Sequence, residues 1–197
     1  MKLVRYGEKG AEKPGLIDKS GQLRDLSAHL KDLTGDAYAP ESLKKLAALD
    51  PASLPAVSGK PRFGAPVTGI SKFVAIGLNY SDHAKETGAA IPTEPIIFMK
   101  ANTSLSGPND AVEKPRGSTK LDWEVEIAAI IGSRAKYVSE ADALNHVAGY
   151  CVCNDVSERN FQQERGCQWT KGKSHDTFGP LGPWLVTKDE IADVQKL

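Results

Sequence analysis

Apolar residues along this chain occur mainly in short runs that alternate with polar ones, a pattern typical of strands of about five residues. The run from Lys2 to Tyr6 predicts one strand, and residues 15–18 and 21–23 predict two more around a turn. Two sets of leucines fall at helical spacing and predict two helical segments: Leu26, Leu30 and Leu33, and then Leu43 and Leu46.

Prolines and glycines recur between residues 50 and 66, where they disfavour a helix or a central strand. We therefore predict a small N-terminal domain with its linker over residues 1–65 and a larger domain over residues 66–197. The apolar runs of the second part are richer in β-branched residues, and they predict strands at 73–77, 95–100, 121–132, 147–154 and 184–186. Helical turns are expected at 81–86, 139–142 and 155–163, and a loop at 169–180. The predicted class is a strand-rich α+β fold.

The composition excludes several kinds of partner. The 25 basic residues balance the 25 acidic ones, so no basic excess favours binding to nucleic acid or to an anionic membrane. The chain begins too polar for a signal peptide and has no apolar run long enough to span a bilayer, which predicts a soluble cytoplasmic protein. The three cysteines argue against a disulfide framework, and Cys151 and Cys153 are expected to be buried free thiols.

The predicted strand at 121–132 carries two glutamates, Glu124 and Glu126. Because side chains alternate along a strand, both carboxylates should lie on one face, opposite Trp123, Val125 and Ile127. Two like charges side by side near a core need neutralising, and an all-oxygen cluster suits Mg²⁺, Mn²⁺ or Ca²⁺. The alternative is an edge strand on which the two glutamates form a solvated face.

Further candidate residues lie outside this strand. Asp155 follows the predicted strand at 147–154 and supplies a third carboxylate, and Gln162 comes seven residues later, about two helical turns along the same face. His83 and Glu86 are three residues apart in a predicted helical turn, where a carboxylate can orient an imidazole as a general base. This spacing is also common on helix surfaces, so alone it favours neither reading.

These stretches together resemble the fumarylacetoacetate hydrolase family. The matching segments are 77–83, 98–100, 122–126, 154–159 and 172–174, in the order in which the family has them. The resemblance implies a mixed β-roll and a homodimer. It also implies a divalent metal, usually Mg²⁺ with Mn²⁺ or Ca²⁺ also possible, held by Glu124, Glu126 and Asp155. No acidic residue stands at 75–77, before His83, where fumarylacetoacetases proper have a fourth ligand, so the sequence resembles the shorter, three-carboxylate branch.

The resemblance also implies roles for other side chains. His83 and Glu86 would form a dyad in a lid segment that activates water, and Lys173 would lie near the metal. Gln162 would face the substrate, and Lys100 is expected near the substrate as well. If the lid orders only on binding, the dyad will assemble only in the closed state. Members of this branch usually continue beyond the point that corresponds to Leu197, so a fragment of a longer protein is expected.

The implied activity is that of a metal-dependent hydrolase or lyase that cleaves a carbon–carbon bond in a small 2-oxo or 1,3-dicarbonyl carboxylic acid, such as an acylpyruvate. Other members of the branch are oxaloacetate decarboxylases, isomerases or hydratases of aromatic catabolism, and ureidoglycolate lyases, and these remain open. A non-catalytic metal-binding module is a further alternative, as is a soluble domain whose carboxylates are merely solvated.

Overall fold

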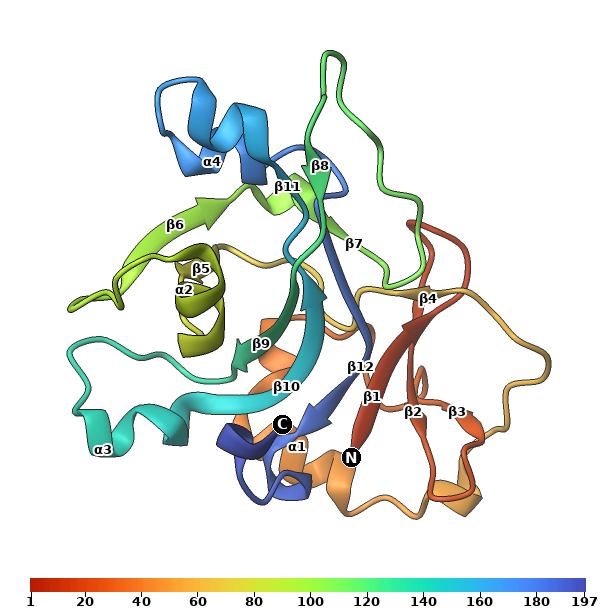
Figure 1. The fold of residues 1–197 in the computed structure, drawn as a ribbon. Coiled ribbons are helices and arrows are strands. Elements are labelled where there is room, and N and C mark those ends of the chain that lie inside the picture. Colours follow the sequence, from red (N-terminus) through yellow and green to blue (C-terminus); the bar gives the residue numbers. More distant parts are fainter.

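The computed structural model describes residues 1–197, and its largest element is a mixed sheet of eight strands (Figure 1). The strands run in the order β3-β2-β1-β12-β10-β9, with β4 added to β1 and β7 added to β12. Only β7 and β12 pair in parallel, and the other ladders are antiparallel. The strand bounds are β1 Lys2–Tyr6, β2 Lys13–Ile17, β3 Leu23–Asp25, β4 Phe63–Gly64, β7 Leu105–Ser106, β9 Val125–Ile131, β10 Val147–Asn154 and β12 Gly179–Thr187.

Two small sheets and a few short helices complete the fold. β5 (Phe73–Gly77) pairs with β6 (Ile96–Lys100), and β8 (Leu121–Asp122) pairs with β11 (Ser157–Glu158). The helices are α1 Pro40–Ala47, α2 Ser81–Thr87, α3 Glu140–Ala143, α4 Trp169–Lys173 and a π-helical turn at Asn160–Glu164. Short 3-10 turns lie at Gly35–Tyr38, Pro51–Ser53, Asn102–Ser104, Leu144–His146, Lys188–Glu190 and Val194–Lys196. The predicted strand-rich α+β class is confirmed.

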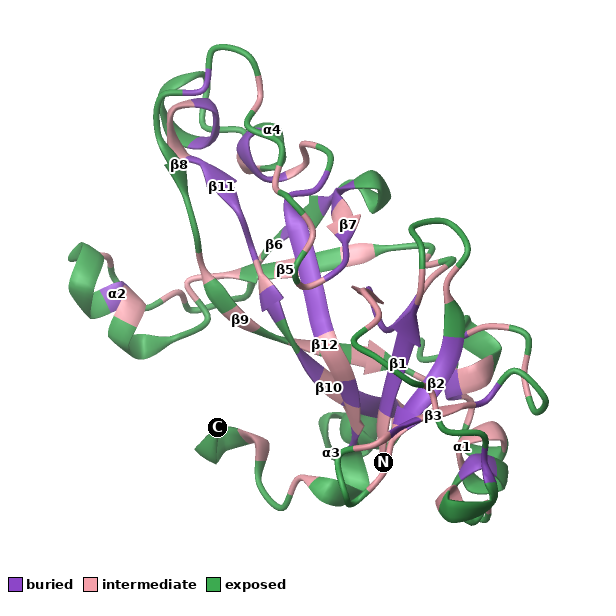
Figure 2. Cartoon of the chain, turned by 90° about the vertical axis from the view of Figure 1, so that its right-hand side faces the viewer, coloured by how far each residue is buried: buried purple, intermediate pink, exposed green.

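The hydrophobic core lies against the central strands of the large sheet. In Figure 2 the buried residues concentrate on β1, β2 and β12. One cluster joins Leu3 and Leu26 from the N-terminal part to Cys151 and Cys153 of β10 and Leu185 of β12. The free thiols predicted at Cys151 and Cys153 are indeed buried. The chain division near residue 65 stays a prediction, while the sheet and its core contain residues from both sides of it.

The prediction of a helix through Leu26, Leu30 and Leu33 was wrong. This segment makes a single turn, closed by the Leu30 amide donating to the Leu26 carbonyl. It then leaves the helical path, because Asp32 accepts hydrogen bonds from the Leu33 amide and from the Arg5 guanidinium of β1. The three leucines of this turn and of the residues after it pack against the core, and their spacing reflects this packing and not a helix.

Three later predictions need correction. The strand expected at 121–132 is broken, because β8 pairs with β11 whereas β9 pairs with β10. Residues 157–158 form β11, so helical turns begin only at Asn160. The expected loop at 169–180 contains α4. No side chain caps the start of this helix, so no capping residue signals it in the sequence.

Candidate active site

Three carboxylates gather where β9 begins and β10 ends. Cys153 pairs with Glu126 in the antiparallel ladder, so Asp155, two residues further, lies beside Glu124. The Asp155 amide donates to the Glu124 carbonyl at 2.9 Å, which fixes the two segments to each other. Glu124 and Glu126 are partly buried, whereas Trp123, Val125 and Ile127 are exposed. The predicted alternation of carboxylates and apolar side chains between the two faces is therefore present. However, β9 is an edge strand, and its apolar face is the one that is exposed to solvent.

The electrostatics of the three acids are uneven. Burial, together with the negative charges of Glu124 and Asp155, raises the pKa of Glu126 to about 7. Glu124 and Asp155 each form ion pairs with basic side chains, but none is formed by Glu126. Glu126 is thus the one of the three carboxylates that has no basic partner in an ion pair.

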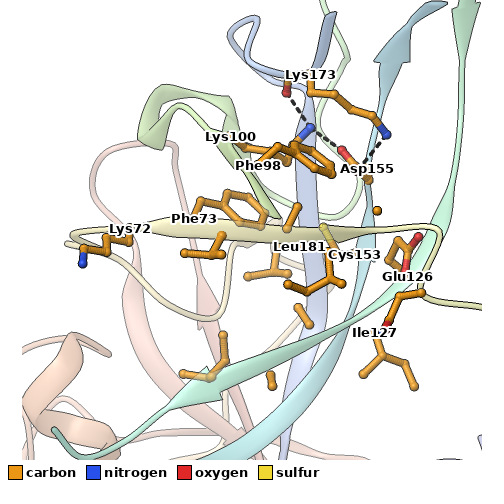
Figure 3. Close-up of a pocket in the computed structure, with 18 of the residues that line it drawn as sticks. Lys72, Phe73, Phe98, Lys100, Glu126, Ile127, Cys153, Asp155, Lys173 and Leu181 are labelled. Atoms are coloured by element: carbon orange, nitrogen blue, oxygen red, sulfur yellow. Dashed lines mark hydrogen bonds and ion pairs between the residues drawn. The ribbon is translucent and has the colours of Figure 1, made fainter. Parts of the chain in front are cut away.

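Two lysines reach Asp155 from different elements. The Lys173 ammonium, at the end of α4, lies 2.7 Å from Glu124 Oε2 and 2.9 Å from Asp155 Oδ2. The Lys100 ammonium, at the end of β6, lies 2.5 Å from Asp155 Oδ1 and donates to the Lys173 carbonyl at 2.5 Å (Figure 3). Both lysines are buried. Asp155 therefore has one oxygen engaged by each ammonium.

The position of Lys173 depends on the packing of α4. Trp169, at the start of α4, lies edge-on to Phe98 of β6, with ring centroids 5.5 Å apart. Gly172 has no side chain, and a Cβ there would lie 2.6 Å from Gln162 Cβ. The missing Cβ allows α4 to approach the turn at Asn160–Glu164 closely, and this brings Lys173 over the acids.

Arg159 is a site residue to which the sequence reasoning gave no role. Its guanidinium lies 2.6 Å from Glu124 Oε1 and 2.8 Å from Asp122 Oδ2, and it donates to Gln162 Oε1 at 3.2 Å. Arg159 lies between Asp155 and Gln162 in one of the motifs that carried the resemblance, and this position was the available signal. The residue links two acids to the candidate substrate-binding Gln162.

A cavity of about 1290 Å³ opens over this cluster. Its lining includes most of the predicted site residues: His83, Lys100, Glu124, Glu126, Asp155, Gln162 and Lys173. Arg159 and Tyr80 also line it. Burial and the negative charge of Glu126 raise the pKa of the Tyr80 phenol.

The predicted dyad is the part of the site that the structure does not bring together. His83 and Glu86 both lie on α2, but no hydrogen bond or ion pair joins them. Glu86 is exposed and is absent from the cavity lining, whereas His83 contributes to it. His175, two residues after Lys173, packs between the rings of Phe161 and Phe178.

The donor atoms fit a hard divalent cation in kind, since Glu124, Glu126 and Asp155 all offer carboxylate oxygens and Glu126 has no cationic partner. In this conformation, however, no three Asp, Glu, His or Cys side chains are grouped so that they could hold a metal ion. The Lys173 ammonium lies between Glu124 and Asp155, so metal binding would require side chains to move.

Comparison with known proteins identifies the family. Residues 72–197 match the model of the fumarylacetoacetate (FAA) hydrolase C-terminal domain. A protein from Burkholderia ambifaria named as a hydrolase is 59% identical over 197 residues, which are 100% of this chain and 70% of that protein.

Solved structures agree with this assignment. Fumarylacetoacetate hydrolase from psychrophilic Exiguobacterium antarcticum superposes with a TM-score of 0.78 at 31% identity, over 96% of this chain and 67% of that one. A Mycobacterium abscessus protein named as a 2-hydroxyhepta-2,4-diene-1,7-dioate isomerase gives a TM-score of 0.73 at 33% identity, over 95% of this chain and 64% of that one.

The chain therefore belongs to the fumarylacetoacetate hydrolase family, and within it to the shorter branch. It is an enzyme of this family, and its fold is the strand-rich fold of these relatives. None of its helices combines the length and the apolar character needed to cross a membrane.

Proposed function

We propose that this protein is a metal-dependent hydrolase or lyase that cleaves a carbon–carbon bond in a small 2-oxo or 1,3-dicarbonyl carboxylic acid, such as an acylpyruvate. The observation that carries the proposal is the grouping of three carboxylates with Lys173 and Arg159 at one cavity. Cationic groups suit an anionic substrate, and carboxylate oxygens suit a hard cation.

The proposed cofactor is Mg²⁺, with Mn²⁺ or Ca²⁺ as alternatives, held by Glu124, Glu126 and Asp155. When bound, such an ion supplies Lewis-acid polarisation of the substrate carbonyl. The partly buried Glu126 supports this choice, because burial and the two neighbouring acids raise its pKa and a nearby cation would stabilise its charged form.

The chain's own residues would do the remaining work. Breaking the carbon–carbon bond leaves negative charge on an enolate-like fragment, and the Lys173 ammonium is close enough to the acids to stabilise that charge where it develops. Gln162, held by Arg159, would orient the substrate through its amide. His83, oriented by Glu86 once α2 moves over the cavity, would remove a proton from water or from the substrate.

An isomerase or hydratase of aromatic catabolism is the second candidate, because three structural neighbours are named as isomerases. An isomerase moves a proton and breaks no carbon–carbon bond, so the products distinguish the two. Oxaloacetate decarboxylase and ureidoglycolate lyase activities also act on anionic substrates and would use the same site. Their substrates therefore belong in the same assay. A homodimer that acts on a small oxo-acid completes the proposal.

The deciding experiment is a turnover panel with Mg²⁺ or Mn²⁺, before and after chelation. The substrates are acylpyruvates, oxaloacetate, ureidoglycolate and a 2-hydroxy-diene-dioate, with products identified by mass. We expect one compound to be turned over, and chelator and Glu124→Ala each to abolish the reaction. Glu8→Ala, which changes an exposed acid far from the site in sequence, is the matched control. Metal binding without turnover of any compound would instead favour a non-catalytic metal-binding module.

The role proposed for His83 has its own test. His83→Ala should remove turnover while metal affinity, measured by calorimetry, stays nearly unchanged, because the imidazole is not one of the proposed ligands. His29→Ala, which alters an exposed histidine of the N-terminal part, should leave both quantities unchanged. A large loss of metal affinity in His83→Ala would refute the role of general base.

A further inference from the structure

Lys100 lies at the end of β6 and is one of the most buried charged residues in the protein, with 1% of its surface exposed. Its ammonium meets three oxygen atoms of the protein. These are Asp155 Oδ1 at 2.5 Å, the Lys173 carbonyl at 2.5 Å and the Val156 carbonyl at 3.4 Å. A buried charge of this kind is stable only when it is paired and hydrogen-bonded.

This environment disfavours direct contact between Lys100 and the substrate. An ammonium has three N–H donors, and three protein acceptors surround it. A substrate oxygen would have to replace one of them, and would leave that buried acceptor unsatisfied. In Figure 3 the ammonium points to Asp155 and to the carbonyl of Lys173.

The neighbours of Lys100 on β6 point to the same segment. The Ala101 amide donates to Ser174 Oγ at 2.9 Å, and Ser174 Oγ donates to the Met99 carbonyl at 3.1 Å. The Lys173 ammonium lies 5.3 Å from the centre of the Phe98 ring. Four consecutive residues, 98–101, therefore contact Lys173 or Ser174, where α4 ends.

We propose that Lys100 is a positioning residue for the reaction. Its ammonium holds Asp155 Oδ1 and thereby turns Oδ2 towards Lys173, and it holds the Lys173 carbonyl and thereby fixes the point from which the Lys173 side chain enters the site. One buried charge sets the orientation of the Asp155 carboxylate and of the Lys173 ammonium together. The kinetic part of this inference rests on the proposed function, whereas the structural part does not.

The test compares Lys100→Met with Lys171→Met in the full chain. Lys171 is exposed and its ammonium donates only to the Arg165 carbonyl, so its replacement removes an ammonium from the same helix without touching Asp155. Hydrogen–deuterium exchange is followed in a peptide covering 169–176, with a peptide from β1 as internal reference. We expect faster exchange in 169–176 for Lys100→Met and no change for Lys171→Met, because only the first loses the hydrogen bond to the Lys173 carbonyl.

Kinetics on the substrate found in the panel give the second readout. Lys100→Met should lower kcat about 100-fold, as a misplaced site commonly does, with KM changed less than about 3-fold. In a Lys173→Met background the same substitution should change kcat less than about 3-fold, because both contacts of Lys100 act on the position of the Lys173 side chain. Lys100→Gln retains N–H donors and should lie between the wild type and Lys100→Met. It replaces Lys100→Met in every assay if that variant does not fold.

The outcomes separate the possibilities. A higher KM with unchanged kcat would mean that Lys100 binds substrate and would overturn the proposal. Unchanged exchange in 169–176, or independent effects in the double variant, would also overturn it. If the wild type turns over none of the compounds, the proposed function fails, and the exchange experiment alone still decides whether Lys100 holds the Lys173 segment.

Discussion

Gly172 is a residue at which a single added atom would disturb the site. Its place next to Lys173 means that any shift of the main chain at 172 is passed directly to the Lys173 ammonium. A Cβ at this position would meet Gln162 and the Glu158 carbonyl, each at 2.6 Å. The atoms that this Cβ would meet include the main-chain nitrogen of Gln162 and the main-chain oxygen of Glu158, so rotation of a side chain cannot relieve the clash.

Gly172→Ala should therefore be destabilising and catalytically damaging. Overpacking of this kind costs about 1–3 kcal/mol, and we expect a lower melting temperature together with a reduced kcat. Gly35→Ala is the control, since a Cβ there meets nothing within 4 Å. Equal melting temperatures and equal kcat values for the two variants would show that α4 does not depend on this close approach.

The residues of the site show why only part of it could be predicted. Glu124, Glu126, Asp155 and Lys173 belong to short motifs, and the structure brings these four side chains together. Arg159 was within a motif, but its partners Asp122 and Glu124 lie more than thirty residues earlier in the chain, and no spacing along the chain reveals such a pair. The pairing of His83 with Glu86 stays a prediction, because it depends on how α2 moves.

At the scale of elements, β4 is tied to the loop after β7 by Arg62 and Asp110. Two parallel hydrogen bonds of 2.6 Å join the guanidinium to the carboxylate, and Arg62 also pairs with Glu12 at 2.9 Å. The hydrogen bonds from Arg62 lower the pKa of Asp110. Folding is therefore linked to the ionisation of this carboxyl group.

Asp110→Asn should destabilise the protein at neutral pH, by about 1.5–3 kcal/mol for the loss of a charged hydrogen-bonding partner. Because the folded pKa lies below the unfolded one, the wild-type contribution is complete above about pH 4 and is lost as the pH falls through the folded value. The difference between variant and wild type, measured by urea unfolding, should thus shrink towards about pH 2. Asp36→Asn, at an exposed acid without an ion pair, is the control. A difference that does not change with pH would contradict this linkage.

Elements with a clear period were predictable, and those defined by distant partners were not. β1, β5, β6 and β10 follow apolar runs in the sequence, and α1 follows its leucines. The break at Trp123 and Glu124 arises because β11 and β10 pair with successive halves of one apolar run. The same run looks uniform in the sequence, since pairing partners more than twenty residues away decide where it divides.

At the scale of the whole molecule, β9 leaves one edge of the large sheet without a further strand. The solvent-exposed face at this edge carries Val125, Ile127 and Ile131 of β9, with Trp123 just before the strand. Val152 of β10 is also exposed and pairs with Ile127. An apolar edge of this kind favours association with other chains.

Val152→Lys should therefore reduce self-association. Val152 is 53% exposed, so a lysine can be accommodated, and its charge opposes burial of this face. Sedimentation velocity over a range of concentrations should show a smaller share of dimers and larger species than in the wild type. Leu144→Lys changes a leucine that is 61% exposed in the turn Leu144–His146, outside β9 and β10, and should not alter the distribution. Identical behaviour of the two variants would place any self-association elsewhere.

The packing of Trp169 gives the protein a built-in optical probe. Its indole ring lies edge-on to Phe98, and it fills the space beside Gly77, the last residue of β5 before the chain turns into α2. A motion of α2 that displaces Gly77 would change the surroundings of this ring. Once Trp123 and Trp184 are replaced by phenylalanine, the remaining tryptophan emission can follow the closing of the site in real time, without a label and without turnover.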